Sequence, residues 1–275
     1  MTAAQALAAA AGRGLDRLDG QLLLLLAMGR SPRERAWLLA HDTDELDERA
    51  RLAFMSFCER RAAGEPLAYI SGRREFFGLD LGVDARVLVP RPDTETLVEW
   101  ALDLIRAHDS PAVIDLGTGS GAIALAIKSR RPDARVAAVD SSTGALQVAA
   151  ANAHDLNMEI DLRQGSWLAG VQGRFDLIVS NPPYIAAGDE HLPGLAHEPV
   201  GALVAGPDGL DDLRTIIDQA PAHLASGGWL LLEHGHEQAG PVQDLLSRAG
   251  FGNIAGRQDL SGIDRCCGGQ WLEQG

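Results

Sequence analysis

Two consecutive prolines stand between an asparagine and a tyrosine at Asn181-Pro182-Pro183-Tyr184. Prolines fix their backbone torsions and lack N–H groups, so this loop offers hydrogen-bond acceptors and almost no donors. The Asn181 side-chain oxygen and the Pro182 carbonyl can each accept one N–H from a planar NH2 group, while the Tyr184 ring packs against its face. Two such acceptors draw the protons out of the conjugated plane and expose the nitrogen lone pair. The tetrapeptide therefore predicts a site that activates an amide or aromatic amine nitrogen.

A glycine-rich stretch forms the second candidate site, Asp115-Leu116-Gly117-Thr118-Gly119-Ser120-Gly121, between an apolar run and a helical segment. Glycines let a ligand approach the backbone closely, and the first turn of a helix offers unpaired N–H groups. Asp140 ends the next apolar run, about 20 residues on, where its carboxylate can accept both hydroxyls of a ribose. A nucleoside-containing cofactor is predicted, and NAD remains possible because Gly117, Gly119 and Ala122 also satisfy G-x-G-x-x-A.

Together the two sites favour methyl transfer. S-adenosylmethionine carries a nucleoside and an electrophilic sulfonium methyl, which a nitrogen lone pair exposed by the 181–184 loop could attack. An NAD-dependent oxidoreductase would leave that loop unexplained, and the sequence offers no obvious acid or base for hydride transfer. A non-catalytic interaction module is the third alternative.

The composition is that of a globular protein, with 275 residues of which 46% are hydrophobic and 23% charged. The longest apolar run covers residues 22–28, well short of the roughly 20 residues that span a bilayer. Without a secretory signal pattern either, we expect a cytoplasmic protein with no membrane association. Cys58, Cys266 and Cys267 fit neither a disulfide framework nor a metal-binding pattern, so no metal is predicted.

The net charge of −14 lies entirely in residues 76–275, which hold 13 basic and 27 acidic residues. A protein that binds duplex DNA normally presents a basic surface, because neutralising phosphates supplies most of the non-specific affinity. This distribution argues against direct nucleic-acid binding.

The sequence pattern divides the chain into three parts: a helical part, a part rich in glycine and proline, and a part in which strands and helices alternate. Residues 2–65 predict a small helical bundle, with helices starting at Thr2 and Ser31 and others over 18–28 and 46–61. Glycines and prolines then break residues 66–92 into short segments with alternating apolar residues, such as 76–89, which suggests a β-hairpin linker. A helix is expected to resume after Pro92, capped by Asp93 or Thr94, and to run to about His108.

Short apolar runs alternate with helical stretches over the rest of the chain, which predicts a mostly parallel sheet covered by helices on both faces. The last two runs lack a full helix between them and suit an antiparallel pair at one edge of the sheet. The predicted strands are 112–116, 135–140, 160–163, 175–180, 229–233, 252–258 and 265–271.

Several motifs resemble those of class I methyltransferases, namely DLGTGSGAIALA from Asp115, VD ending at Asp140, FDLIVSNPPYIA from Phe175 and GWLLLEHG from Gly228. Three more resemble the HemK/PrmC family, namely PLAYISGRREFFGL from Pro66, VLVPRPDTETLVE from Val87 and LVAGPDGLDDLR from Leu203. The resemblance covers roughly residues 15–270.

The resemblance implies a Rossmann-like methyltransferase domain at 93–275, a β-hairpin linker at 66–92 and an N-terminal helical bundle at 1–65 that binds the substrate protein. The implied activity is methyl transfer from S-adenosylmethionine to the side-chain amide nitrogen, N5, of the glutamine in the GGQ motif of peptide chain release factors. A monomer is expected. The runner-up is an adenine-N6 DNA methyltransferase, since such enzymes use a closely similar tetrapeptide.

The family pattern also implies roles for individual residues. Trp167 would flank the adenine ring, and Arg91 and Glu95 would lie near the cofactor. Catalysis would fall to Asn181, Pro182 and Tyr184, and substrate binding to Asn181, Pro182, Pro183 and Tyr184. The implied cofactor-binding residues are Gly117, Thr118, Gly119, Ser120, Gly121, Asp140, Trp167 and Asn181.

Two positions depart from the family pattern. Ser166 stands where family members commonly have an acid beside the tryptophan. Cys266 and Cys267 replace ordinary apolar strand residues, and we expect them to be small buried hydrophobes. The Gly268-Gly269-Gln270 sequence that follows matches the family's substrate motif by coincidence, and we expect it on an edge strand.

Overall fold

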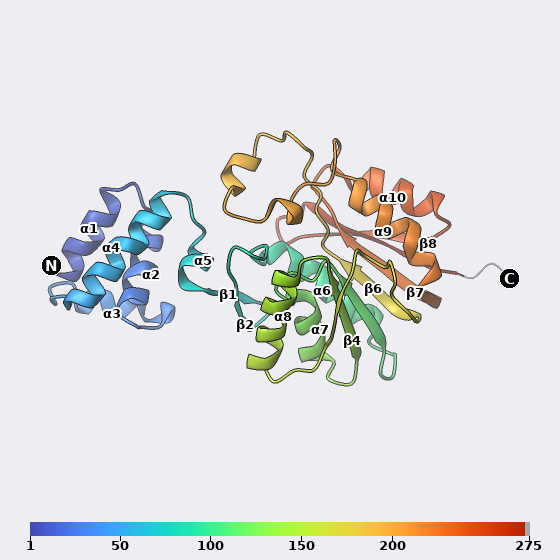
Figure 1. Ribbon diagram of the computed structural model, residues 1–275, viewed down its shortest axis with the longest axis horizontal. Coiled ribbons are helices and arrows are strands. Elements are labelled where there is room, and N and C mark those ends of the chain that lie inside the picture. Colours follow the sequence, from blue (N-terminus) through green and yellow to red (C-terminus); the bar gives the residue numbers. More distant parts are fainter. Residues whose placement is uncertain (273–275) are drawn as a thin grey trace. The chain divides into compact units, whose positions relative to one another are not determined.

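The computed structural model describes residues 1–272 and divides into two compact units, Met1–Arg73 and the chain from Arg74 onward (Figure 1). Each unit has its own hydrophobic core. Within residues 1–272, no helix is long and apolar enough to cross a membrane.

The first unit is built of helices, and two of its helical segments begin at the predicted residues Thr2 and Ser31. Thr2 and Gln5 form a reciprocal capping box before α1, and Ser31 caps a short 3-10 turn with Pro32 in its first position. Leu23, Leu24 and other apolar side chains pack inward. The helices are α1 (Ala3–Ala11), α2 (Arg17–Ala27), α3 (Arg35–Ala40), α4 (Glu48–Ala62) and α5 (Leu67–Ser71).

A two-stranded hairpin follows, made of β1 (Arg73–Phe76) and β2 (Leu79–Gly82). Its turn residues Phe77 and Gly78 both have positive φ, 52° and 82°, as a tight two-residue hairpin turn requires. This hairpin lies within the predicted linker at 66–92, and only the first part of the alternating stretch 76–89 is in its strands, because Phe77-Gly78 forms the turn. The predicted domain limits at residues 65 and 92 remain predictions.

A seven-stranded sheet forms the centre of the second unit, in the order β5-β4-β3-β6-β7-β9-β8. The first five of these strands run parallel, while β9 is antiparallel to both β7 and β8. This confirms the predicted α/β fold with an antiparallel pair at one edge. The strands are β3 (Ala112–Leu116), β4 (Arg135–Asp140), β5 (Asp161–Gln164), β6 (Phe175–Ser180), β7 (Leu224–Glu233), β8 (Gly252–Gln258) and β9 (Asp264–Gln270).

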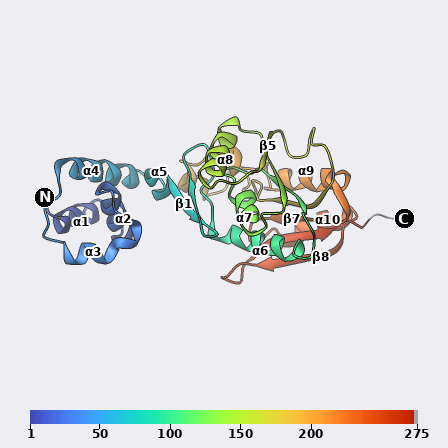
Figure 2. The same cartoon turned by 90° about the horizontal axis from the view of Figure 1, so that it is seen from below.

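Helices cover both faces of the sheet because its strands are apolar on both sides. Val113 of β3 joins the core under α6 and α7, whereas Ile114 and Leu116 join the core under α9 and α10 (Figure 1). Figure 2 shows α6 and α10, which both pack against β8. The helices are α6 (Glu95–Leu104), α7 (Ala122–Arg130), α8 (Thr143–Asp155), α9 (Asp211–Gln219) and α10 (Ala239–Arg248).

Strand β9 lies inside the sheet, between β7 and β8. The Gly268-Gly269-Gln270 sequence on it is therefore not on an edge strand, and that prediction is wrong. A Cβ at Gly268 would come within 2.4 Å of Leu231, so the close approach of β7 requires glycine there. Cys266 and Cys267 are fully buried, as predicted.

The connections place the candidate residues at one edge of the sheet. The chain passes from β3 outward to β4 and β5, and then returns to β6 on the other side of β3. Open α/β sheets bind their ligands at such a reversal, beyond the carboxyl ends of the strands. The glycine loop follows β3, Asp140 ends β4, and Asn181 follows β6.

Candidate active site

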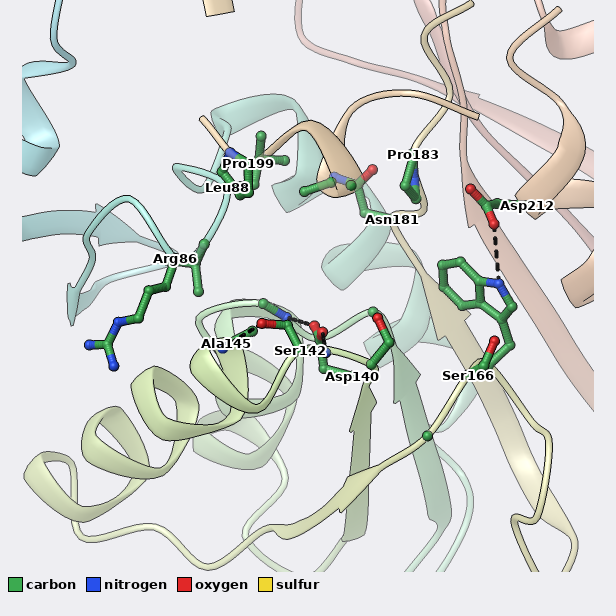
Figure 3. Close-up of a pocket in the computed structure, with 18 residues that line it drawn as sticks. Arg86, Leu88, Asp140, Ser142, Ala145, Ser166, Asn181, Pro183, Pro199 and Asp212 are labelled. Carbon is green, nitrogen blue, oxygen red and sulfur yellow. Dashed lines mark hydrogen bonds between the residues drawn. The ribbon is translucent and has the colours of Figure 1, made fainter. Parts of the chain in front are cut away.

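A cavity of about 330 Å3 opens at this edge of the sheet. Asp140 and Ser142 lie on one side of it, and Asn181 and Pro183 lie on the opposite side (Figure 3). The other residues that line it, all in the second unit, are Arg86, Val87, Leu88, Gly117, Gly119, Ser141, Ala145, Gly165, Ser166, Trp167, Pro199, Gly201, Ala202 and Asp212.

The floor of the cavity is shaped by the contact between Gly117 and Trp167. Gly117 has φ 70°, and a Cβ there would lie 3.1 Å from the Trp167 ring, so a larger residue would push the ring away. Trp167 itself has φ 52°, which is rare for a bulky residue. Its indole N–H donates to Asp212 at 3.2 Å, which fixes the ring in the wall of the cavity.

Asp140 retains acceptor capacity that faces the cavity. Its Oδ2 accepts the Gly119 N–H at 2.9 Å, and its Oδ1 accepts the Ser142 N–H at 2.8 Å. A carboxylate has about four lone-pair positions. Each oxygen can therefore accept one more hydrogen bond, which matches the two adjacent hydroxyls of a ribose.

Other residues of the glycine loop support it from below. The Thr118 hydroxyl donates to Oδ2 of Asp115 at 2.6 Å, and the Ala124 N–H donates to the same oxygen at 3.2 Å. Burial raises the pKa of Asp115 to about 7, although both hydrogen bonds oppose that rise. Thr118, Ser120 and Gly121 do not line the cavity, and their predicted cofactor contacts stay predictions.

The cavity fits S-adenosylmethionine by the chemistry of its lining. Trp167 offers a flat aromatic surface to an adenine ring, and Asp140 offers two acceptors to a ribose. The bare backbone at Gly117 and Gly119 leaves room for the rest of the ligand, as both glycines line the cavity. Ser166 replaces the acid of the family pattern, yet the Asp212 carboxylate also lines the cavity beside Trp167.

A second cavity, of about 300 Å3, adjoins the first. Asn181, Leu88 and Ala202 line both cavities. The remaining lining is largely apolar and consists of Arg91, Pro182, Tyr184, Ile185, Leu195 and Leu203. The tetrapeptide therefore divides between the cavities, with Pro183 facing the first and Pro182 and Tyr184 facing the second.

The Asn181 side chain is oriented by a hydrogen bond that its Nδ2 donates to Thr94 Oγ1 at 3.1 Å. Within residues 1–272, neither the Asn181 side-chain oxygen nor the Pro182 carbonyl accepts a hydrogen bond. Both acceptors predicted from the sequence are thus available to an incoming N–H group.

Buried polar contacts join the segments that enclose the two cavities. Glu198 accepts the Val89 N–H at 3.1 Å and forms an ion pair with Arg91. Gly209 packs closely against the 181–184 loop, since a Cβ at Gly209 would come within 2.2 Å of the Tyr184 carbonyl oxygen. Glycine is required there, since φ is also 73°.

From the sequence, none of Thr94, Glu198, Asp212 and Glu233 was placed in the site. Glu233 is buried and contacts the Tyr184 hydroxyl at 3.5 Å. Three of these residues lay in motifs that carried the family resemblance, but nothing in the sequence told which side chain pointed inward. The described residues contain no group of three or more His, Cys, Asp or Glu placed to hold a metal ion.

Two family models match the chain. Residues 94–200 match the methyltransferase small domain, and residues 1–72 match the PrmC N-terminal domain. Solved structures with the same fold include a methyltransferase from Pyrococcus furiosus, 17% identical with a TM-score of 0.53, covering 71% of this chain and 90% of that one. The Thermus thermophilus 16S rRNA N2 G1207 methyltransferase in complex with AdoMet and guanosine is 19% identical, with a TM-score of 0.53, over 72% and 49% of the two chains.

Curated relatives match nearly the whole chain. The release factor glutamine methyltransferase of Xylella fastidiosa (strain Temecula1) is 49% identical over 94% of this chain and 95% of its own length. Its counterpart in Burkholderia pseudomallei is 47% identical over 93% and 92%, and that of Pseudomonas aeruginosa is 48% identical over 93% and 92%.

The fold, the cavity and the matching methyltransferase domain define a class I methyltransferase that uses S-adenosylmethionine. A sequence identity of nearly 50% to the curated relatives, over almost the full length of the chain, then specifies the family within that class. The chain belongs to the release factor glutamine methyltransferase family, which confirms the resemblance found in the sequence.

Proposed function

We propose that this protein transfers a methyl group from S-adenosylmethionine to N5 of the glutamine in the GGQ motif of peptide chain release factors. One observation carries the assignment beyond family membership. Asn181 lies where the two cavities meet, and its side-chain oxygen has no partner among residues 1–272. A glutamine side chain entering the second cavity would bring its amide to this oxygen.

The residues of the loop hold and prepare the substrate amide. The Asn181 side-chain oxygen and the Pro182 carbonyl each accept one N–H, which fixes the amide and favours a more tetrahedral nitrogen. When bound, S-adenosylmethionine supplies an electrophilic methyl group on its sulfonium sulfur. Asp140, Trp167 and Gly117 hold the cofactor, and Tyr184 packs against the amide. The amide proton becomes acidic once nitrogen is alkylated, so no strong base is needed.

The helical unit supplies a surface for the substrate protein. A groove of about 590 Å3 in this unit is lined by Leu18, Leu39 and three arginines, Arg17, Arg33 and Arg35. Leu18 and Leu39 are 46% and 66% exposed. Apolar side chains framed by cations suit a segment that carries both apolar and acidic residues. We assign this groove to the release factor.

The protein acts in the cytoplasm as a monomer, without membrane or nucleic-acid partners. The charge of −14 on the chain supports the exclusion of nucleic acid, because phosphates would be repelled. Light scattering on the purified protein checks the monomer, which a mass of two chains would contradict.

Methyl transfer to a release factor tests the function directly. Purified protein is incubated with tritium-labelled S-adenosylmethionine and either a release factor or duplex DNA. We expect label on the release factor alone, and mass spectrometry should place one added methyl on the GGQ glutamine. Label on DNA alone would instead establish an adenine-N6 DNA methyltransferase. A release factor with the glutamine replaced by alanine is the matched control and should stay unlabelled.

A further inference from the structure

A chain of buried polar groups lies behind the Asn181 side chain. Asn181 Nδ2 donates to the Thr94 hydroxyl oxygen at 3.1 Å. Thr94 is 4% exposed and ends the short 3-10 turn Pro92–Thr94. Glu233, the last residue of β7, is 1% exposed, and the Thr94 side chain hydrogen-bonds to its carboxyl, which lowers the Glu233 pKa. Glu233 Oε1 receives the Tyr184 hydroxyl at 3.5 Å, and its Oε2 is buried without a partner in the described chain.

We propose that Thr94 and Glu233 are positioning residues, which hold the Asn181 amide with its oxygen, and not its NH2 group, toward the methyl-accepting nitrogen. The proposal rests on the proposed function, since it matters only if Asn181 receives an N–H from the substrate. It concerns residues that touch neither cavity, because Thr94 and Glu233 line neither of them.

The orientation of the Asn181 amide depends on which of the neighbouring groups can donate a proton. A primary amide presents acceptor and donor on atoms of nearly equal size, so a half-turn of Asn181 would offer the substrate amide two donors and no acceptor. The Thr94 hydroxyl has one proton. An ionised Glu233 can only accept, so Thr94 donates its proton toward the carboxylate and keeps a lone pair for Asn181. That lone pair on Thr94 Oγ1 accepts a hydrogen bond from Asn181 Nδ2, whereas it would repel the side-chain oxygen of Asn181.

The charge on Glu233 sets the direction of this chain. Burial raises the pKa of Glu233 to about 7, opposed by the Thr94 hydrogen bond and the positive charge of Arg265. Asp93 faces the same carboxyl and raises its pKa further, while Tyr184 donates to it and Cys266 of β9 lies in its field. A protonated Glu233 can itself donate to Thr94, which frees the Thr94 proton to point at Asn181. Turnover should then fall on the acid side of pH 7.

The first test compares two substitutions at Thr94 in the full-length enzyme, with a GGQ-containing peptide as acceptor. Thr94→Val removes the hydroxyl while keeping the shape, and we expect kcat to fall by about 10- to 100-fold. The dissociation constant for S-adenosylmethionine, from calorimetry, should stay within about threefold. Thr94→Ser restores the hydroxyl and should recover most of kcat. Thr96→Val, the same change two residues further along the chain, is the matched control.

A double-mutant cycle and the pH dependence of kcat test the positioning role, because a merely structural role would change neither. In an Asn181→Ala background, Thr94→Val should cause no further loss of kcat. Glu233→Gln should abolish the acid-side decline of kcat, because its amide does not titrate. Any of three results would contradict the positioning role. Thr94→Val could lower kcat in the Asn181→Ala background as much as in the wild type, or Thr94→Ser could fail to restore kcat. Alternatively, kcat of Glu233→Gln could still decline on the acid side of pH 7.

The outcomes separate the two proposals. A wild-type enzyme that methylates no GGQ substrate overturns the proposed function and this inference with it. An active wild type whose variants match it overturns the positioning role alone. Loss of the cooperative thermal transition would show that Thr94→Val fails to fold. In that case Thr94→Ser and Glu233→Gln still test the positioning role, because both retain polar groups of similar size.

Discussion

Asn181 is the residue on which cofactor and substrate chemistry meet, because it lines both cavities. Its oxygen is proposed to act on the reacting nitrogen, so its contribution should be larger in the transition state than in ground-state binding. We expect Asn181→Ala to lower kcat by about 100-fold or more, with a much smaller change in the dissociation constant for S-adenosylmethionine. Single-turnover transfer and calorimetry measure the two quantities.

The reverse pattern in Asn181→Ala, a large loss of cofactor affinity with normal turnover at saturation, would contradict this role. Asn181→Asp is the informative companion. It keeps an acceptor oxygen but cannot donate to Thr94, so it should also be impaired.

Asp140 should behave in the opposite way, since its spare lone pairs face the ribose position and not the reacting atoms. In Asp140→Asn the NH2 group cannot accept from Gly119 or Ser142, and one ribose acceptor is lost. We expect the dissociation constant for S-adenosylmethionine to rise by about 10- to 100-fold, and kcat at saturating cofactor to change little. Asp161→Asn, at an exposed position on the neighbouring strand, is the control, and equal affinities in both variants would refute the assignment.

At the scale of elements, the buried Glu198 ties the segment 185–201 to Val89 and Arg91, beside the site. The Glu198 side chain is 3% exposed, and its removal leaves the Val89 N–H and the Arg91 guanidinium without this acceptor. Glu198→Ala should raise KM for both cofactor and peptide and speed proteolysis within 185–201, while costing about 1–3 kcal/mol in stability. Glu190→Ala, exposed in the same segment, should do neither. Unchanged proteolysis in Glu198→Ala would mean that the tie is dispensable.

Most of the strands could be predicted from the sequence because both faces of this sheet are covered. Buried strands are typically short continuous apolar runs, and β3, β4 and β6 begin and end at the predicted residues. The bounds of β8 were also predicted correctly, although it is a largely exposed edge strand. β7 was predicted to start at 229 but starts at Leu224. The added residues include Gly227 and Gly228, and a Cβ at Gly228 would lie 2.9 Å from the Ala225 carbonyl oxygen, so this irregular stretch of strand needs glycine.

The site was only partly predictable, for a physical reason. Gly117, Asp140 and Asn181 sit directly beyond apolar strands, so their place at the sheet edge follows from the chain order. Asp212 reaches the first cavity from α9, and Glu198 reaches Val89 from a loop 109 residues further along the chain, so both approaches depend on tertiary packing. Thr94 read as a helix cap, but it makes no capping hydrogen bond and turns to Asn181 instead.

At the scale of the whole molecule, two buried carboxyls should govern how stability depends on pH. Burial raises the pKa of Asp115 and of Glu233 to about 7 in the folded protein. Between about pH 4 and pH 7 the folded state therefore holds protons that the unfolded chain has released, and stability from these groups falls as pH rises. Urea unfolding should show a smaller decline in Asp115→Asn, by up to about 1.4 kcal/mol per pH unit. An identical slope in wild type and variant would contradict the buried, protonated state.

The two units are proposed to bind different parts of the substrate, and comparing an intact release factor with a short GGQ peptide can separate their contributions. If the groove at Leu18 and Leu39 binds the release factor, its contribution exists only for the intact protein, because a GGQ peptide occupies the catalytic unit alone. Leu39→Glu places an anion among the arginines and removes an exposed apolar contact. We expect KM for the intact factor to rise by about tenfold while KM for the peptide stays unchanged.

Leu52→Glu is the matched control for the groove, since Leu52 is 55% exposed in the same helical unit but lies outside the groove. It should leave both KM values as in the wild type. Equal effects of Leu39→Glu on factor and peptide would point to a disturbed fold, and no effect on either would remove the groove from the binding surface. A rise confined to the intact factor would mean that the helical unit selects the protein and the Asn181 loop selects the glutamine.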